Sequence, residues 1–157
     1  MRQFIPTPSG RQRFNVLGAL NAVTHKMITL TNTGYINSWS VVNLLRQLRC
    51  AHPLEPITVV LDNAPYQKCY LVKCAATMAN IELLYLPTYS PNLNLIERAW
   101  KFVKKKALYC KVYPNFSAFS DGIMGCIEGF EDVYKEELRS LMTWDFQRFK
   151  KSQTMTA

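Results

Sequence analysis

The hydrophobic pattern of the first third of the chain predicts a hairpin followed by a helix. Two β-prone runs, FNVLGAL (14–20) and MITLTN (27–32), flank a short, mostly polar segment, as antiparallel strand pairs do. Apolar positions then recur at helical spacing from Ser38 to Cys50. The apolar face expected for this helix consists of Trp39, Val41, Val42, Leu44, Leu45 and Leu48.

Two continuous apolar runs in the middle of the chain predict strands buried on both faces. ITVVLD (57–62) and IELLYL (81–86) are short, apolar runs, as strands of parallel sheets are. Pro65 is expected to open a helix that reaches about Ala79, because proline is tolerated in a first helical turn. The order hairpin, helix, strand, helix, strand, helix predicts an α/β domain with a mixed sheet flanked by helices.

The rest of the pattern is helical. A helix from about Asn94 to Leu108 has an expected buried stripe of Ile96, Trp100, Val103 and Ala107. After Pro114, helices are predicted at about 116–131 and 135–142, and we expect them to pack outside the α/β unit. TWDFQRFK (143–150) is ambiguous.

Composition narrows the class of protein. A chain of 157 residues suits one domain with a real core. A net charge of +8 and a pI near 9.4 fit a polyanionic partner such as nucleic acid, although solubility explains them equally well. No apolar run approaches the roughly 20 residues that cross a membrane, and the N-terminus lacks the apolar stretch of a signal peptide, so we expect a cytoplasmic protein. The five cysteines form no CxxC and stand far from the two histidines; reduced, mostly buried thiols are expected rather than a zinc site.

Asp62 is the first residue with candidate chemistry, because it ends a predicted buried strand. Ligands of open α/β sheets bind beyond the carboxyl ends of parallel strands, so a carboxylate there faces the crevice. Alternatively, Asp62 or Asn63 caps the helix that begins at Pro65, which stabilises by about 1 kcal/mol.

Glu97 is the second candidate. It stands between the proline-rich loop LPTYSPNLN (86–94) and a lysine cluster, and shares a polar stripe with Lys101, Lys104 and Lys105. An i,i+4 pair with Lys101 adds about 0.2–0.5 kcal/mol of helix support, and a first-turn glutamate suits the helix dipole. Neither effect explains why two prolines restrict the backbone ahead of Glu97. Such a restricted loop is expected where a side chain must point in one fixed direction.

Together these residues predict a metal site beside a DNA-binding surface. Carboxylate oxygens of Asp62 and Glu97 suit Mg²⁺, and two ions about 4 Å apart can activate a water or a 3′-hydroxyl for phosphodiester attack. The lysines one and two turns further along would hold phosphates without reading sequence. The predicted DNA-binding set is Arg11, Arg13, Arg98, Lys101, Lys104 and Lys105.

The segments LDNAPYQ and IELLYLPTYSPNLNLIERAWKFVKKK resemble the catalytic domain of Tc/mariner-type DDE transposases, particularly the bacterial insertion-sequence branch. The resemblance runs from about Pro6 to Phe149, and the 34 residues between Asp62 and Glu97 match the spacing of that branch's second and third acidic residues. It implies a ribonuclease-H-like fold in about residues 1–112, with C-terminal helices at about 115–150. It also implies dependence on Mg²⁺ or Mn²⁺, with Asp62 and Glu97 as catalytic metal ligands, and the cutting and joining of element-end and target DNA in a bacterial cytoplasm.

The chain departs from this family at one point. The family's first catalytic aspartate lies on the first, central strand, and no acidic residue precedes Glu55 here. We therefore expect a transposase fragment that lacks this strand, either a truncated gene product or the second half of a split reading frame. It is expected to be silent or impaired alone, and to have a complementing N-terminal fragment or a second copy as partner.

Two alternatives remain open. In the first, the chain is a catalytically inactive remnant that only binds DNA or binds the full-length transposase. In the second, it is another ribonuclease-H-like nuclease, such as a junction resolvase. The missing strand also predicts absent or strained pairing beside Val59 and Val60, and a tendency to self-associate, since an apolar strand would keep an unpaired edge.

Overall fold

The computed structural model describes residues 12–87 and 93–143. The predicted hairpin is confirmed: β1 (Asn15–Leu20) and β2 (Met27–Asn32) pair antiparallel, from Asn15 opposite Asn32 to Leu20 opposite Met27. Asn21 holds the turn, because its side-chain oxygen accepts hydrogen bonds from two backbone N–H groups of the loop. An Asn side chain that bonds the backbone two or three residues on stabilises a tight turn.

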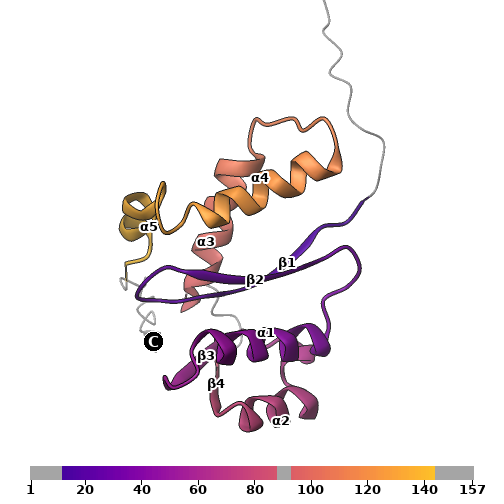
Figure 1. Cartoon of the computed structure of the whole chain (residues 1–157), viewed down its shortest axis with the longest axis vertical. Helices are drawn as coiled ribbons and strands as arrows, with labels where there is room; N and C mark the ends of the chain where they lie inside the picture. The colour runs from indigo at the N-terminus through magenta and orange to yellow at the C-terminus, as the bar shows by residue number, and fades with distance from the viewer. Residues whose placement is uncertain (1–11, 88–92, 144–157) are drawn as a thin grey trace, which may run out of the picture.

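The hairpin lies between two groups of helices (Figure 1). Leu17 and Leu30, which are opposite each other, pack against the core that contains α1 (Ser38–Ala51), whereas Val16 and Leu20 pack against the core formed by the C-terminal helices. Alternate side chains of a strand point to opposite faces, so the hairpin contributes to both cores.

Helix α1 begins where the sequence predicts. Asn37 caps it, accepting from the backbone N–H of Ser40, and the Ser40 hydroxyl accepts from the backbone N–H of Asn37. The expected apolar face is buried except for Trp39, which is 62% exposed. The prediction for Trp39 is wrong because it lies two residues before Val41, about 200° around the helix.

Strands β3 (Ile57–Leu61) and β4 (Ile81–Tyr85) form a parallel pair, as expected of a crossover unit. The connection differs from the predicted continuous helix: η1 (Pro65–Gln67) is a single 3₁₀ turn, and α2 (Tyr70–Met78) follows it. The guanidinium of Arg49, from the end of α1, donates to the carbonyls of Ala79 and Asn80 just before β4, at 2.7 Å each.

The prediction that β3 and β4 are buried on both faces is wrong for the described residues. Burial alternates along both strands: Val59 and Leu83 pack on α1 and α2, while Val60 is 44% and Leu84 51% exposed. Val59 and Leu83 thus share a core with α1 and α2, while Val60 and Leu84 lie on the other, more exposed face.

The C-terminal helices pack in one core with the start of the glutamate-bearing helix. This core joins α3 (Leu95–Val103), η3 (Lys104–Leu108), α4 (Phe116–Glu128) and α5 (Lys135–Leu141) with one face of the hairpin. The buried stripe of α3 is rotated from the predicted one: Ala99 and Phe102 are buried with Val103 and Ala107, while Ile96 and Trp100 are only partly covered. The proposed division near residue 112 stays a prediction.

The strands form two separate sheets within the described residues. β1 pairs only with β2, and β3 only with β4, so in residues 12–87 and 93–143 no strand pairs with the other edge of β3 beside Val59 and Val60. The expectation of mostly buried thiols is wrong, since Cys126 alone of the five is buried. None of the described helices is long and apolar enough to cross a membrane.

Candidate active site

A cavity of about 580 Å³ lies between the two sheets. One wall is β1 and the other is β3, while helix α1 and the beginning of α3 close the space between them. Both predicted metal ligands line this cavity, and their neighbours in it include Tyr66, Gln67, Ile96 and Trp100.

Asp62 follows the last residue of β3, where the sequence predicts a ligand-facing carboxylate. The capping alternative is wrong: the residue that caps η1 is Ala64, and neither η1 nor α2 receives a side-chain hydrogen bond at its start. The side chain of Asn63 instead donates to the carbonyl of Leu86, which ties the loop after β3 to the loop after β4. Asp62 is therefore left free to face the cavity.

Glu97 lies in the first turn of α3 and is exposed. The side chain of Asn94 caps this helix, accepting from the backbone N–H of Ile96 at 3.4 Å, and so fixes where the helix begins. The expected ion pair with Lys101 is absent among the described residues, which contain ion pairs elsewhere. No local partner in the described chain occupies this carboxylate.

The electrostatics of the cavity are visible in Tyr66. Burial raises the pKa of its phenol, and the negative charge of Asp62 raises the pKa further, while a hydrogen bond with the Gln67 side chain lowers it. The charge of Asp62 thus acts on the phenol of Tyr66, which also lines the cavity. Two carboxylates suit a hard divalent cation, although no group of three His, Cys, Asp or Glu side chains that could hold a metal occurs within residues 12–87 and 93–143.

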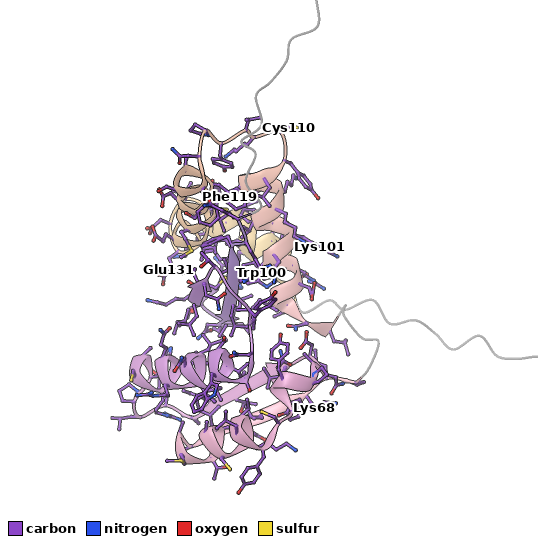
Figure 2. The ribbon with its side chains drawn as sticks, turned by 90° about the vertical axis from the view of Figure 1, so that its right-hand side faces the viewer. Lys68, Trp100, Lys101, Cys110, Phe119 and Glu131 are labelled. Carbon is purple, nitrogen blue, oxygen red and sulfur yellow. The ribbon has the colours of Figure 1, made fainter. Side chains whose placement is uncertain are left out.

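The lysine cluster divides into two kinds of side chain. Lys101, Lys104 and Lys105 are exposed and form no ion pair within the described part of the chain, and Figure 2 shows Lys101 pointing outward from α3. Lys106 instead pairs with Glu137 at 2.8 Å and lies over the Phe102 ring. Three lysines are thus available to phosphates, as the predicted DNA-binding set requires.

The predicted arginines have different surroundings. Arg13 is exposed, with its guanidinium 4.7 Å from the centre of the Tyr35 ring. Arg98 donates to the backbone carbonyls of Leu141 and Thr143, so it ties α3 to the end of α5. Arg11 lies outside the described residues. A DNA contact for any of the three stays a prediction.

The pattern of the sequence missed three residues of the cavity wall. Tyr66 and Gln67 belong to the quoted segment LDNAPYQ, but their side chains gave no signal apart from their distance of four and five positions from Asp62. Trp100 belongs to the predicted buried stripe but is only partly buried: Figure 2 shows it at the hairpin, and a Cβ on Gly18 would lie 3.1 Å from its ring.

Comparison with known structures agrees with this architecture. The chain has 16% identity to a Mos1 transposase paired-end complex with the left transposon end, with a TM-score of 0.57 over 94% of this chain and 48% of that one. A Mos1 mariner paired-end complex with Mn gives 14% identity and the same TM-score, over 93% and 48% of the two chains. A simian T-cell lymphotropic virus intasome, in complex with PP2A regulatory subunit B56 gamma, gives 14% identity and a TM-score of 0.52, over 78% and 52%.

These similarities show the fold, a ribonuclease-H-like α/β fold, and the chain spans about half the length of each of these proteins. No curated protein matches the sequence. A family model described as DDE superfamily endonuclease matches residues 2–120, a segment that includes both predicted metal ligands and the lysine cluster. The chain therefore belongs to the DDE superfamily endonucleases.

Proposed function

We propose that this chain supplies two of the metal-binding carboxylates of a Tc/mariner-type transposase, which cuts and joins DNA when its catalytic domain is complete. The observation that carries the proposal is that Asp62 and Glu97, which come after β3 and from α3 and have 34 residues between them, line one cavity in a member of the DDE superfamily endonucleases. The insertion-sequence branch follows from the resemblance of LDNAPYQ and SPNLNLIE to that group.

Each part of the site has a task in this proposal. Asp62 and Glu97 offer carboxylate oxygens, and the Asn63 and Asn94 side chains hold their loops in place. Bound Mg²⁺ or Mn²⁺ would supply activation of a water or a 3′-hydroxyl and charge stabilisation of the leaving oxygen. Lys101, Lys104 and Lys105 bind DNA phosphates beside the reacting strand.

A second function is favoured by one observation. A third carboxylate of the described residues, Glu55, also lines the cavity, but it pairs with His52 at 2.6 Å, and no group of three His, Cys, Asp or Glu side chains in these residues could hold a metal ion. Two-metal chemistry needs both cations to clamp the in-line displacement, so a chain with an incomplete set binds DNA, or the full-length transposase, without cutting.

A cleavage assay tests the proposal. The 157-residue chain is incubated with labelled element-end DNA and Mg²⁺ or Mn²⁺, alone and together with the polypeptide encoded upstream. We expect no cleavage by the chain alone and metal-dependent cleavage by the mixture, lost in Asp62→Asn and Glu97→Gln and kept in Glu128→Gln, which changes an exposed carboxylate of α4.

Cleavage by the mixture that survives both cavity substitutions would contradict the assignment of Asp62 and Glu97. DNA binding without cleavage under every condition would favour the inactive remnant. Robust cleavage by the chain alone would show that no further carboxylate is needed.

A further inference from the structure

Two large aromatic side chains are exposed on either side of the start of α1. Tyr35 is 77% and Trp39 62% exposed, and Asn37, the residue that caps α1, lies between them in the sequence. In the part of the chain that the structure describes, neither the Tyr35 hydroxyl nor the Trp39 indole N–H forms a hydrogen bond. Each ring therefore offers an apolar face together with an unused polar tip, a combination that is enriched in binding surfaces.

The backbone that carries these rings is held in place by side-chain hydrogen bonds. The Asn15 side chain donates to the Asn32 side chain at 2.9 Å and to the carbonyl of Gly34 at 2.6 Å. The Asn32 side chain donates in turn to the carbonyl of Tyr35 at 3.2 Å. The capping box at the start of α1 fixes the helical turn that contains Trp39. A surface that is ordered before binding loses less conformational entropy when a ligand binds.

The charge around the two rings favours a polyanion. The guanidinium of Arg13 lies 4.7 Å from the centre of the Tyr35 ring. Residues 1–54, which include the hairpin and α1, contain no Asp or Glu. The first turn of α1 therefore has no acidic side chain to neutralise the positive end of its helix dipole. Exposed aromatic rings in a cationic setting fit a nucleic acid strand, which has both phosphates and flat apolar bases.

These rings lie beside the cavity that contains the predicted metal ligands. Ile36, the residue after Tyr35, lines this cavity together with Asp62 and Glu97. The loop that carries Tyr35 leaves the hairpin at the end where β1 begins, and it leads into α1 (Figure 1). A DNA strand whose backbone reaches the carboxylates can therefore place neighbouring nucleotides on the two rings.

We propose that Tyr35, Trp39 and Arg13 form a stacking platform for unpaired nucleotides of a DNA strand next to the candidate active site. The two rings stack on bases, and Arg13 contacts the backbone phosphates. Every base has a flat face, so this binding tolerates any sequence, but in a duplex those faces are covered by the neighbouring base pairs. The platform therefore selects unpaired over paired DNA. The inference rests on the proposed function for DNA as the partner, and it requires neither metal nor cleavage.

The test compares the binding of the full chain to a fluorescently labelled single strand and to the duplex of the same sequence. Anisotropy is measured in EDTA, so that no cleavage occurs. Replacing Tyr35 and Trp39 together with alanine should weaken single-strand binding about tenfold or more, because base stacking is lost. Duplex affinity should change by less than about twofold, since paired bases do not reach the rings. The salt dependence of single-strand binding should stay the same, because no phosphate contact is removed.

Two control variants separate stacking from general effects on the surface. Tyr35→Phe combined with Trp39→Phe keeps two aromatic rings and should keep most of the single-strand affinity. Tyr70→Ala combined with Met78→Ala removes two large exposed side chains of α2 and should leave both affinities unchanged.

Four results would overturn the proposal, and each has a different meaning. Equal losses for single strand and duplex would show that the rings do not select unpaired bases. Unchanged single-strand affinity in the alanine variant, with duplex binding intact, would remove the platform and leave DNA as the partner. Absence of binding to either form of DNA would remove the DNA partner of the proposed function as well. Weaker self-association of the alanine variant in sedimentation, without loss of single-strand affinity, would assign the rings to an interface between copies of this chain.

Discussion

Asparagine side chains position both carboxylates of the candidate site. Asn63 holds the loop after β3 by a hydrogen bond to Leu86, and Asn94 fixes the first turn of α3, in which Glu97 stands. Because these two amides carry the local hydrogen bonds, neither Asp62 nor Glu97 is needed as a cap. Within the segment LDNAPYQ, Asn63 therefore holds the loop in place, and Asp62 is the candidate metal ligand.

A residue-scale prediction concerns Tyr66. Asp62→Asn removes a negative charge, so the pKa of Tyr66 should fall from its value in the native chain. It should stay above the ordinary value of 10.0, because burial is the larger cause of its elevation and the substitution leaves burial unchanged. Tyrosine NMR signals followed against pH measure this, with Tyr85 as an internal control, since its pKa is raised by burial and Cys69.

The same shift has a stability consequence. The pKa of Tyr66 is raised in the folded state, so its contribution is fully present below about pH 10 and is lost as pH rises through the folded pKa. In Asp62→Asn the stability lost above about pH 10 should be smaller, because the pKa of Tyr66 is then raised less. An unchanged Tyr66 titration in folded Asp62→Asn would place the Asp62 carboxylate too far from the cavity wall for the account above.

At the scale of elements, contact between the hairpin and α3 sets the position of Glu97. A side chain on Gly18 would meet Met27 and the Trp100 ring, and Trp100 lies one turn after Ile96 and Glu97. Close approach of backbone and aromatic ring therefore explains why β1 has glycine at this position.

Gly18→Ala should destabilise the chain by about 1 kcal/mol, the cost of overpacking less the gain from replacing a strand glycine. Met27 can shift its flexible end, but the Trp100 ring must move with α3. Urea denaturation followed by tryptophan fluorescence measures the change. Gly34→Ala, where nothing lies within 4 Å, is the matched control and should be close to neutral. Equal effects of the two substitutions would show that Trp100 does not fix α3 against β1.

Hydrophobic periodicity and turn residues predicted most of the helices and strands, because nearby side chains determine where these elements begin and end. The hairpin and α1 begin and end within about one residue of the prediction, since Asn21, Asn37 and Ser40 give local turn and cap bonds. Burial was harder to predict. Val60 and Leu84 are apolar but half exposed, because what covers a strand face is decided by elements distant in sequence.

The candidate site shows the same limit. Asp62 and Glu97 stand out from the sequence by position and spacing, whereas Tyr66, Gln67 and Trp100 do not. Tyr66 and Gln67 line the cavity from the 3₁₀ turn Pro65–Gln67, and Trp100 lines it where α3 approaches Gly18 of the hairpin. Neither arrangement is encoded in a periodic pattern of a single element.

Over the whole molecule, charge distinguishes the cavity that contains Asp62 and Glu97 from the lysine-rich surface next to it. The net charge is +8, and exposed lysines follow Glu97 along α3 and η3, so a polyanion bound to them passes the carboxylates. Lys106 is excluded from this surface by its ion pair with Glu137, which also raises its pKa.

Replacing Lys101, Lys104 and Lys105 together with alanine should weaken DNA binding and reduce its salt dependence. Each phosphate contact contributes about 0.9 to the slope of log affinity against log salt, so the slope should fall by about 2 to 3. Fluorescence anisotropy with a duplex at several salt concentrations measures it. The control, Arg46, Lys73 and Lys135 replaced by alanine, removes three exposed charges from other helices and should change the slope much less. Equal slopes for the two triple variants would remove α3 from the DNA-binding surface.

An NMR titration with Mn²⁺ tests whether Asp62 and Glu97 share one divalent cation. Paramagnetic broadening should appear together, at the same Mn²⁺ concentration, on amides around residues 61–63 and 96–98. Asp62→Asn or Glu97→Gln should remove both effects, and Glu128→Gln should leave them intact. Broadening of one segment alone, or broadening that persists in either cavity variant, would contradict a shared site.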